Sequence, residues 1–167
     1  MAPRTKKPPL PPMTVVIDTR EQCPYNFEDI QPRPLVELGT LRTGDYSILG
    51  CEHEICIERK TCADAFGTFG RGRDRFEREL DRMSKYKHAA VVIEADWYTI
   101  LRVYPTIKFT PKAFLYSVIA WQQRYGVHFW TVPSRVFAER TTYRILQRFW
   151  KDKHEPKQMS KQESKAA

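Results

Sequence analysis

The stretch GDYSILGCEHEICIERKTCAD, residues 44–64, decides the fold because it has the pattern of a β-hairpin. In its second half, Ile55 and Ile57 alternate with residues that face the opposite side of a strand. A glycine separates this strand from an earlier one, and glycine is typical of tight turns. We therefore predict a hairpin over residues 45–60 that turns near Gly50.

The predicted hairpin also brings several charged side chains close together. Glu58 and Lys60 are two residues apart on one strand, so both project to the same face. In a regular hairpin Asp45 lies close to them, and Asp18 ends another strand. Either these charges form a solvated strand edge or they form a metal site.

Buried strands and amphipathic helices alternate along the rest of the chain. MTVVIDTRE has three consecutive β-branched residues, which is typical of a strand buried on both faces. This order predicts an α/β sandwich with a mixed sheet. Strands are predicted within residues 13–21, 35–48, 89–96 and 127–132, and helices over 61–69, 74–87, 110–126 and 134–150.

Residues that favour helix ends support the predicted helices. Ser, Thr and Asp cap helix starts, and Gly commonly ends a helix. The predicted caps are Thr61, Asp74, Thr110 and Ser134, with Gly126 as a terminator. The apolar stripe predicted for the first long helix contains Phe76, Leu80, Met83 and Lys87.

Composition and charge favour a folded protein with a polyanionic partner. Of the 167 residues, 41% are hydrophobic and 13% are aromatic, which suits one domain with its own core. The net charge of +8 favours nucleic acid first and an anionic membrane surface second.

The two ends of the chain differ in composition from its body. We predict a flexible, basic, proline-rich arm over residues 1–12, a folded domain over 13–150 and a disordered polar tail over 151–167. The sequence has no apolar run of the roughly 20 residues that a membrane helix needs, and no secretory signal. We expect a cytoplasmic, non-secreted protein without a membrane partner, associated with the nucleoid if it is prokaryotic or from a phage.

Three of the four cysteines lie close together in the sequence, which raises the question of zinc. Cys51, Cys56 and Cys62 lie near His53, but no C-x-x-C pair is present, and the spacings are wrong for a structural zinc site. We interpret the three as buried free thiols.

Two acids and a lysine on one hairpin are the minimal equipment for phosphodiester hydrolysis. Two close carboxylates repel each other unless a cation lies between them. Mg²⁺ binds through one or two carboxylates, waters and phosphate oxygens, and it activates water and stabilises charge on phosphate. A neighbouring lysine adds a positive contact to the water or the phosphate.

A longer pattern resembles a known family. Asp45 and Glu58-x-Lys60 match the PD-(D/E)xK nucleases with Gly44 in place of proline, although E-x-K alone is common at charged strand edges. The full pattern of Gly-Asp, a spacer, Glu-Arg-Lys, three residues and Asp64 is similar to the signature of the XPF family of structure-specific DNA endonucleases. The segments VIDTRE, GRGRDRFERELDRM and AAVVIEAD also resemble that family, so the resemblance covers about residues 14–150.

The resemblance implies a restriction-endonuclease-like three-layer core with a mixed sheet flanked by helices. It implies that Asp45 and Glu58 bind Mg²⁺ or Mn²⁺ together with the backbone carbonyl of Arg59. Lys60 would position or polarise the attacking water.

The resemblance also implies supporting roles for four more residues. Asp18 and Glu21 would be further acids of the catalytic site, either supporting the ligands or binding a second metal. Arg20, like Arg59, would contact phosphate or hold the acids. Asp64 would support Lys60 or Arg59, or it would cap its own helix.

A basic loop follows the signature. GTFGRGRDRFER, residues 67–78, contains glycines that let the backbone approach a phosphate and arginines that neutralise it. We predict DNA contacts by Arg71, Arg73 and Arg75, with a solvated loop of paired charges as the alternative. Such contacts carry no base specificity.

The sequence departs from the better-known family members, which carry a tandem helix-hairpin-helix module after the nuclease domain. Here a polar tail follows Trp150, so we expect dimerisation through the C-terminal helices or a separate targeting protein. The predicted function is a metal-dependent DNA endonuclease that acts on branched or single-strand-containing DNA in repair, recombination or replication. The alternatives are a DNA-binding or scaffold subunit without cleavage, and an interaction domain whose charged hairpin is only solvated.

Overall fold

The computed structural model describes residues 9–103 and 109–155. The predicted alternation of strands and helices is present, together with one short helix, α3, that was not predicted from the sequence. In chain order the elements are β1 (Thr14–Asp18), β2 (Leu35–Gly39), β3 (Tyr46–Ile48), β4 (Ile55–Thr61), α1 (Cys62–Phe69), α2 (Arg73–Met83), β5 (His88–Glu94), α3 (Trp97–Ile100), α4 (Pro111–Tyr125), β6 (His128–Thr131) and α5 (Arg135–His154).

The strands form one mixed sheet in the order β2-β1-β3-β4-β5-β6. β1 pairs parallel with β2 and antiparallel with β3, and β4, β5 and β6 run parallel to one another. The predicted hairpin is the antiparallel pair β3–β4, in which Tyr46 lies opposite Ile57. This register brings the start of β3 to the middle of β4.

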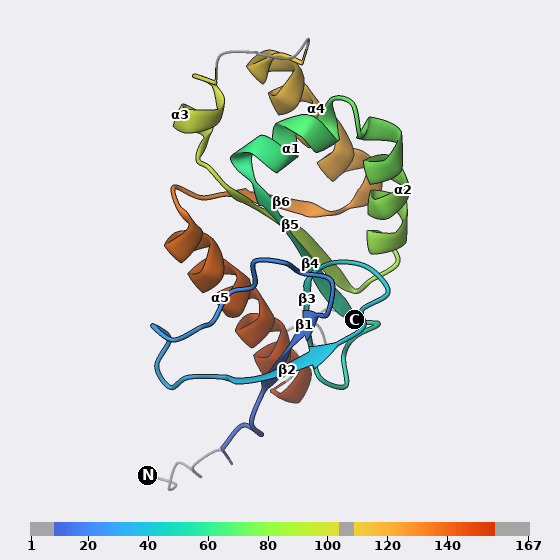
Figure 1. Cartoon of the computed structure of the whole chain (residues 1–167). Coiled ribbons are helices and arrows are strands. Elements are labelled where there is room, and N and C mark those ends of the chain that lie inside the picture. Colours follow the sequence, from blue (N-terminus) through green and yellow to red (C-terminus); the bar gives the residue numbers. More distant parts are fainter. Residues whose placement is uncertain (1–8, 104–108, 156–167) are drawn as a thin grey trace, which may run out of the picture.

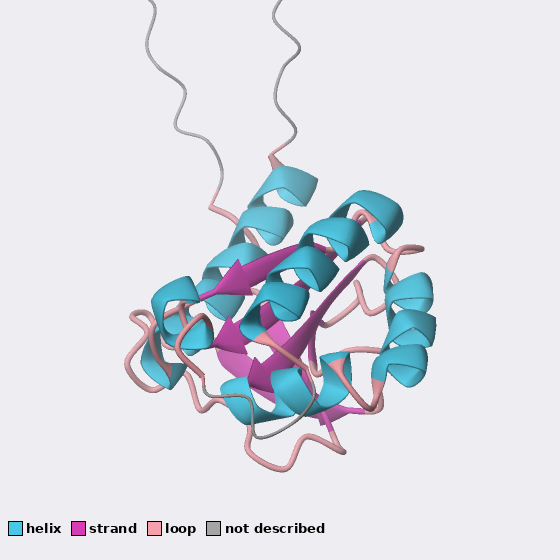
Figure 2. Cartoon of the chain, turned by 90° about the horizontal axis from the view of Figure 1, so that it is seen from above, coloured by secondary structure: helices cyan, strands magenta, loops and turns pink. Residues whose placement is uncertain are grey.

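Helices cover both faces of the sheet, so the molecule has three layers (Figures 1 and 2). α5 lies on one face, where its Tyr143 and Leu146 belong to the same apolar cluster as Ile55 and Ile57 of β4. α1, α2 and α4 lie on the other face, where their aromatic side chains pack with Cys56. The predicted α/β class with a mixed sheet flanked by helices is confirmed.

Because side chains alternate along β4, the charged residues near its carboxyl end project to both faces of the sheet. Arg59 continues the row of Ile55 and Ile57 on the α5 face. Glu58 and Lys60 continue the row of Cys56 on the α2 face. The sheet therefore separates Arg59 from its two charged neighbours in the sequence.

Three helix starts and one helix end agree with the prediction. The side chains of Thr61, Thr110 and Ser134 accept the N–H three residues further on, at the starts of α1, α4 and α5. Gly126 ends α4 in the left-handed conformation with φ of +67°. Cys51 and Cys56 are buried free thiols, as predicted, whereas Cys62 is partly exposed and Cys23 is exposed.

The predicted bounds of α2 are wrong. Asp74 lies inside the first turn, and Gly72 is the N-cap without a side-chain hydrogen bond. A Cβ on Gly72 would lie 3.1 Å from the Cα of Thr68, so this glycine lets α1 and α2 pack closely and starts the helix there. α2 ends at Met83, and Lys87 is therefore not part of its stripe.

The predicted start of the polar tail is also wrong, because α5 continues to His154. Lys153 in its last turn forms an ion pair with Glu54 of the β3–β4 turn, which holds residues 151–154 on the folded body. Residues 1–8 of the predicted arm and 156–167 of the predicted tail lie outside the described residues. No helix in the described part of the chain has both the length and the apolar character to cross a membrane.

Candidate active site

The turn before β3 holds Asp45 against β4. Gly44 has φ of +77°, which glycine adopts without strain. A Cβ on Gly44 would lie 3.1 Å from the carbonyl oxygen of Ile57, so the turn packs directly on the next strand. The N–H of Asp45 donates to that carbonyl (2.8 Å), and the Asp45 carboxylate accepts the N–H of Arg59 (2.7 Å).

Replacing Gly44 by alanine is expected to lower the free energy of unfolding by about 2–3 kcal/mol, since a left-handed backbone and a close contact both penalise a Cβ. Gly50 is the matched control, because it has φ of +78° but no atom within 4 Å of a Cβ. Gly50→Ala should cost only about 1–2 kcal/mol. Urea unfolding measures both values, and equal losses would show that the Gly44 contact does not constrain the turn.

Glu58 and Lys60 lie on the same face of β4, as predicted, and form an ion pair. Glu58 is 6% exposed. The ammonium of Lys60 also lies 5.5 Å from the ring centroid of Phe76. The hairpin register places Asp45 beside Glu58, so two carboxylates and one ammonium share a site with little access to water, where charges interact strongly.

Burial and like charge disfavour the ionised forms of the two acids. Burial raises the pKa of Glu58, and the charge of Asp45 raises it further, against the opposing effect of Lys60. Burial raises the pKa of Asp45 more than a backbone hydrogen bond lowers it, and the charges of Glu21 and Glu79 add to the rise. Burial alone would lower the pKa of Lys60, but its acidic neighbours raise it, so Lys60 is a cation. Glu79, on α2, was not predicted.

Asp18 has its own partners. The side chain is 3% exposed, and its carboxylate accepts hydrogen bonds from the backbone and guanidinium of Arg20 (2.7–3.0 Å) and from the N–H of Leu41 (2.7 Å). Burial raises the pKa of Asp18, but these bonds outweigh it and lower the pKa overall. The N–H of Asp18 donates to the Asp45 carbonyl (2.8 Å). Asp18 therefore supports the backbone at Asp45.

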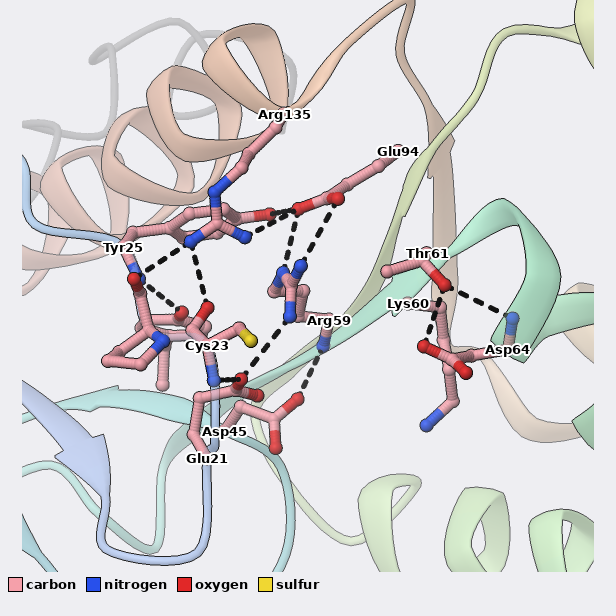
Figure 3. A network of polar contacts seen from close by, with 12 residues as sticks. Glu21, Cys23, Tyr25, Asp45, Arg59, Lys60, Thr61, Asp64, Glu94 and Arg135 are labelled. Atoms are coloured by element: carbon pink, nitrogen blue, oxygen red, sulfur yellow. Dashed lines mark hydrogen bonds and ion pairs between the residues drawn. The ribbon is translucent and has the colours of Figure 1, made fainter.

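Arg59 holds two acids, which is one of its two predicted roles. Its guanidinium donates to both oxygens of Glu94 (2.7 and 3.2 Å) and to Glu21 (3.2 Å). Figure 3 shows Arg59 between these two carboxylates. All three side chains are only 9–10% exposed. The other predicted role of Arg59, a contact to phosphate, stays a prediction, and in this structure the guanidinium is paired with the two acids.

The sequence reading missed Glu94 and Arg135. Glu94 ends β5, and it accepts a hydrogen bond from the Tyr25 hydroxyl (3.0 Å). Arg135 begins α5, contacts Glu94 (3.4 Å) and donates to the carbonyls of Cys23 and Pro24 (2.8 Å each). The sequence could have indicated Glu94, because this residue ends a buried strand as Asp18 does. The carboxyl ends of parallel strands lie at the same edge of a sheet.

Asp64 takes part in the cap of α1, whose N-cap is Thr61, and capping is one of its predicted alternatives. The hydroxyl of Thr61 accepts the N–H of Asp64 (3.1 Å) and donates to its carboxylate (2.6 Å). This reciprocal pair satisfies the first turn of the helix. The described contacts of Asp64 thus support the helix after β4.

A family model for the ERCC4 domain matches residues 17–145, which is more than half of the 167 residues and includes the whole site. The chain belongs to the ERCC4 domain family. Comparison with curated protein sequences gave no match.

The match to the ERCC4 domain confirms the predicted family, and the likeness of this ERCC4 domain to two XPF structures confirms the predicted core. XPF from Aeropyrum pernix is similar with a TM-score of 0.60 and 20% identity over 80% of this chain and 58% of that one. A second structure, XPF from Aeropyrum pernix in complex with DNA, is similar with a TM-score of 0.62 and 19% identity over 86% of this chain and 66% of that one. The chain thus spans less than two thirds of the length of both.

The arginines after the signature differ in their contacts within this ERCC4 domain. Arg73 donates to the Ser117 hydroxyl (2.8 Å), pairs with Glu77 (3.1 Å) and lies 4.6 Å from the ring centroid of Trp121. It therefore packs α2 against α4. Arg71 and Arg75 are exposed and stay predicted DNA contacts.

The donor set of the ERCC4 domain fits a magnesium ion held by few ligands. Among residues 9–103 and 109–155, no group of three or more His, Cys, Asp or Glu side chains is arranged to hold a metal. Asp45 and Glu58 are nevertheless enough, because Mg²⁺ often binds proteins through one or two carboxylates. A cation between them would also relieve the repulsion by Asp45, which adds to the effect of burial in raising the pKa of Glu58.

Proposed function

We propose that this ERCC4 domain is a divalent-metal-dependent DNA endonuclease that hydrolyses phosphodiester bonds in branched or single-strand-containing DNA. The observation that carries the proposal is the group formed by Asp45, just before β3, with Glu58 and Lys60 on one face of β4, in which Glu58 is buried and the other two are half-buried. Two carboxylates whose ionised forms are disfavoured lie beside a half-buried ammonium. The net charge of +8 and the DNA complex of the Aeropyrum pernix protein support DNA as the partner.

Each residue of the group has a distinct role in this proposal. Asp45, Glu58 and the backbone carbonyl of Arg59 would hold Mg²⁺ or Mn²⁺. The bound ion would supply activation of water and stabilisation of charge on the phosphate. Lys60 would orient the attacking water or the phosphate oxygen through its ammonium. Arg59 would keep the strand in place through Glu21 and Glu94.

A substrate panel tests the function directly. The protein is incubated with labelled single-stranded, flap, fork and duplex DNA in Mg²⁺ or Mn²⁺, with EDTA as the control. We expect cleavage of at least one substrate that contains single-stranded DNA, and background cleavage in EDTA and with Asp45→Asn. Absence of cleavage on every substrate, or equal cleavage by the variant, would reject the proposal.

The Asp45→Asn variant should also show whether Mg²⁺ binds at Asp45, because its melting temperature can be compared with that of the wild type with and without the ion. Asparagine can still accept the Arg59 N–H, but it removes a buried charge, so we expect a melting temperature a few degrees higher without metal. Mg²⁺ at 100 times its Kd should stabilise the wild type by about 2.7 kcal/mol, or about 5–10 °C, but not the variant. Differential scanning fluorimetry in EDTA and in Mg²⁺ measures this. An equal response of both proteins to Mg²⁺ would place the ion elsewhere.

A DNA-binding subunit without cleavage is the second candidate. It is favoured by the small donor set, since no third acidic, His or Cys side chain joins Asp45 and Glu58 in the described residues to hold a metal. It predicts salt-sensitive DNA binding without metal-dependent hydrolysis. In either case we propose a cytoplasmic role in repair, recombination or replication, as a homodimer or with a targeting protein.

A further inference from the structure

A small pocket lies close to the candidate active site along the chain, because its lining includes Thr43, two residues before Asp45. Its volume is about 200 Å³, below the roughly 300–1,000 Å³ typical of sites for drug-sized ligands. It therefore suits a small group. The lining residues are Arg42, Thr43, His53, Arg82, Lys85 and Tyr86.

Two hydroxyl groups of the pocket residues lack hydrogen-bond partners. Thr43 is only 4% exposed, and its hydroxyl has no partner in the described structure. The Tyr86 hydroxyl is likewise shielded from solvent and unpartnered among those residues. Buried hydroxyls are normally hydrogen-bonded, so two in one pocket indicate a missing acceptor or donor.

Positive charge surrounds these hydroxyls. Lys85 pairs with Asp81 (3.1 Å), and Arg82 donates to the carbonyl of Arg78 (3.2 Å). Arg42 has no acidic partner within residues 9–103 and 109–155. Burial raises the pKa of the Tyr86 hydroxyl, and the charges of Arg42 and Arg82 oppose this rise, so both guanidinium groups are within electrostatic range of it.

We propose that this pocket binds a phosphate group. A phosphate is an acceptor with three or more oxygens, and it can take hydrogen bonds from both hydroxyls while arginines neutralise its charge. Arg42 and Arg82 supply that charge from the loop before β3 and from the last turn of α2. Lys85 and His53 stand at the same opening.

The position of the pocket indicates the backbone of bound DNA as the source of the phosphate, and this part of the inference rests on the proposed function. Thr43 is two residues from Asp45, which is at most about 7 Å between Cα atoms. The pocket would hold a phosphate near the one that is cleaved and thereby position the strand.

Inorganic phosphate tests the chemistry of the pocket alone. Isothermal titration at constant ionic strength should show saturable binding to the wild type and none to Arg42→Gln/Arg82→Gln. Thr43→Val should weaken binding by about tenfold. The control Arg144→Gln/Arg148→Gln removes the same charge from α5 and should bind like the wild type. Absence of binding by the wild type, or equal loss in both double variants, overturns the proposal.

Fluorescence anisotropy with single-stranded DNA in EDTA tests whether the DNA backbone supplies the phosphate that binds in the pocket. If the DNA backbone supplies the phosphate, Arg42→Gln/Arg82→Gln weakens DNA binding by about tenfold or more, and inorganic phosphate competes with DNA on the wild type. Unchanged DNA binding by that variant, with phosphate binding lost, assigns the pocket to free phosphate and rejects the DNA backbone. Because neither assay needs cleavage, phosphate binding by a protein that cuts no DNA would reject the proposed function and keep the pocket.

Discussion

Changing Glu58 to glutamine is expected to lower the single-turnover rate of DNA cleavage by about 10³-fold or more. Glu58 faces both Asp45 and Lys60, so the change removes one of the two carboxylates proposed to bind the metal, and the partner of the ammonium. The fold should be retained, because glutamine has nearly the same size and burial already raises the pKa of Glu58 toward its neutral form. Rapid mixing of excess enzyme with labelled DNA in Mg²⁺ measures the rate.

Two controls test whether the lower cleavage rate reflects the loss of a catalytic group rather than a loss of folding or of DNA binding. The anisotropy-based DNA affinity of Glu58→Gln should stay close to that of the wild type, since the side chain is buried away from solvent, and circular dichroism should show that the fold is retained. Lys60→Ala removes the other member of the pair and should reduce the rate by about 10²–10³-fold without weakening DNA binding. A Glu58→Gln protein within tenfold of the wild-type rate would remove Glu58 from the reaction.

Replacing Arg59 by methionine is expected to lower the free energy of unfolding by about 3–5 kcal/mol. The change leaves the carboxylates of Glu21 and Glu94 buried without their cation, and both are only 10% exposed. Removing one partner of a buried ion pair costs more than the pair itself contributes. Denaturation by urea, followed by circular dichroism, measures the loss.

Arg148→Met is the matched control for this change. Arg148 pairs with Asp152 on the surface of α5, where both side chains are at least half exposed. Such pairs contribute about 0.5 kcal/mol or less. If Arg59→Met lowers the free energy of unfolding no more than Arg148→Met, the contacts of Arg59 in Figure 3 do not stabilise β4.

The sequence was sufficient where local geometry decides position. Asp45, Glu58 and Lys60 lie on one hairpin, so strand periodicity and a single turn bring them together. The caps Thr61, Thr110 and Ser134 were equally predictable, because each acts within one helical turn.

The sequence was not sufficient to predict contacts between side chains that are distant in the chain. The pairing of Arg59 with Glu94 depends on β4 and β5 lying side by side, which no local pattern specifies. The sequence left two roles open for Asp18, and no local pattern indicated its hydrogen bond to the N–H of Leu41, 23 residues further along the chain. Asp74 failed as a cap because close packing at Gly72, rather than capping preference, starts α2.

The alternation along β4 limits how this protein can change in length during evolution. Deletion of one residue within 55–60 would exchange the two faces of the strand, so that Arg59 would take the place of its neighbours Glu58 and Lys60. Insertions in the turn over residues 49–54 would leave that alternation intact. We therefore expect homologous sequences to vary in length in the turn and to keep the spacing within β4 unchanged.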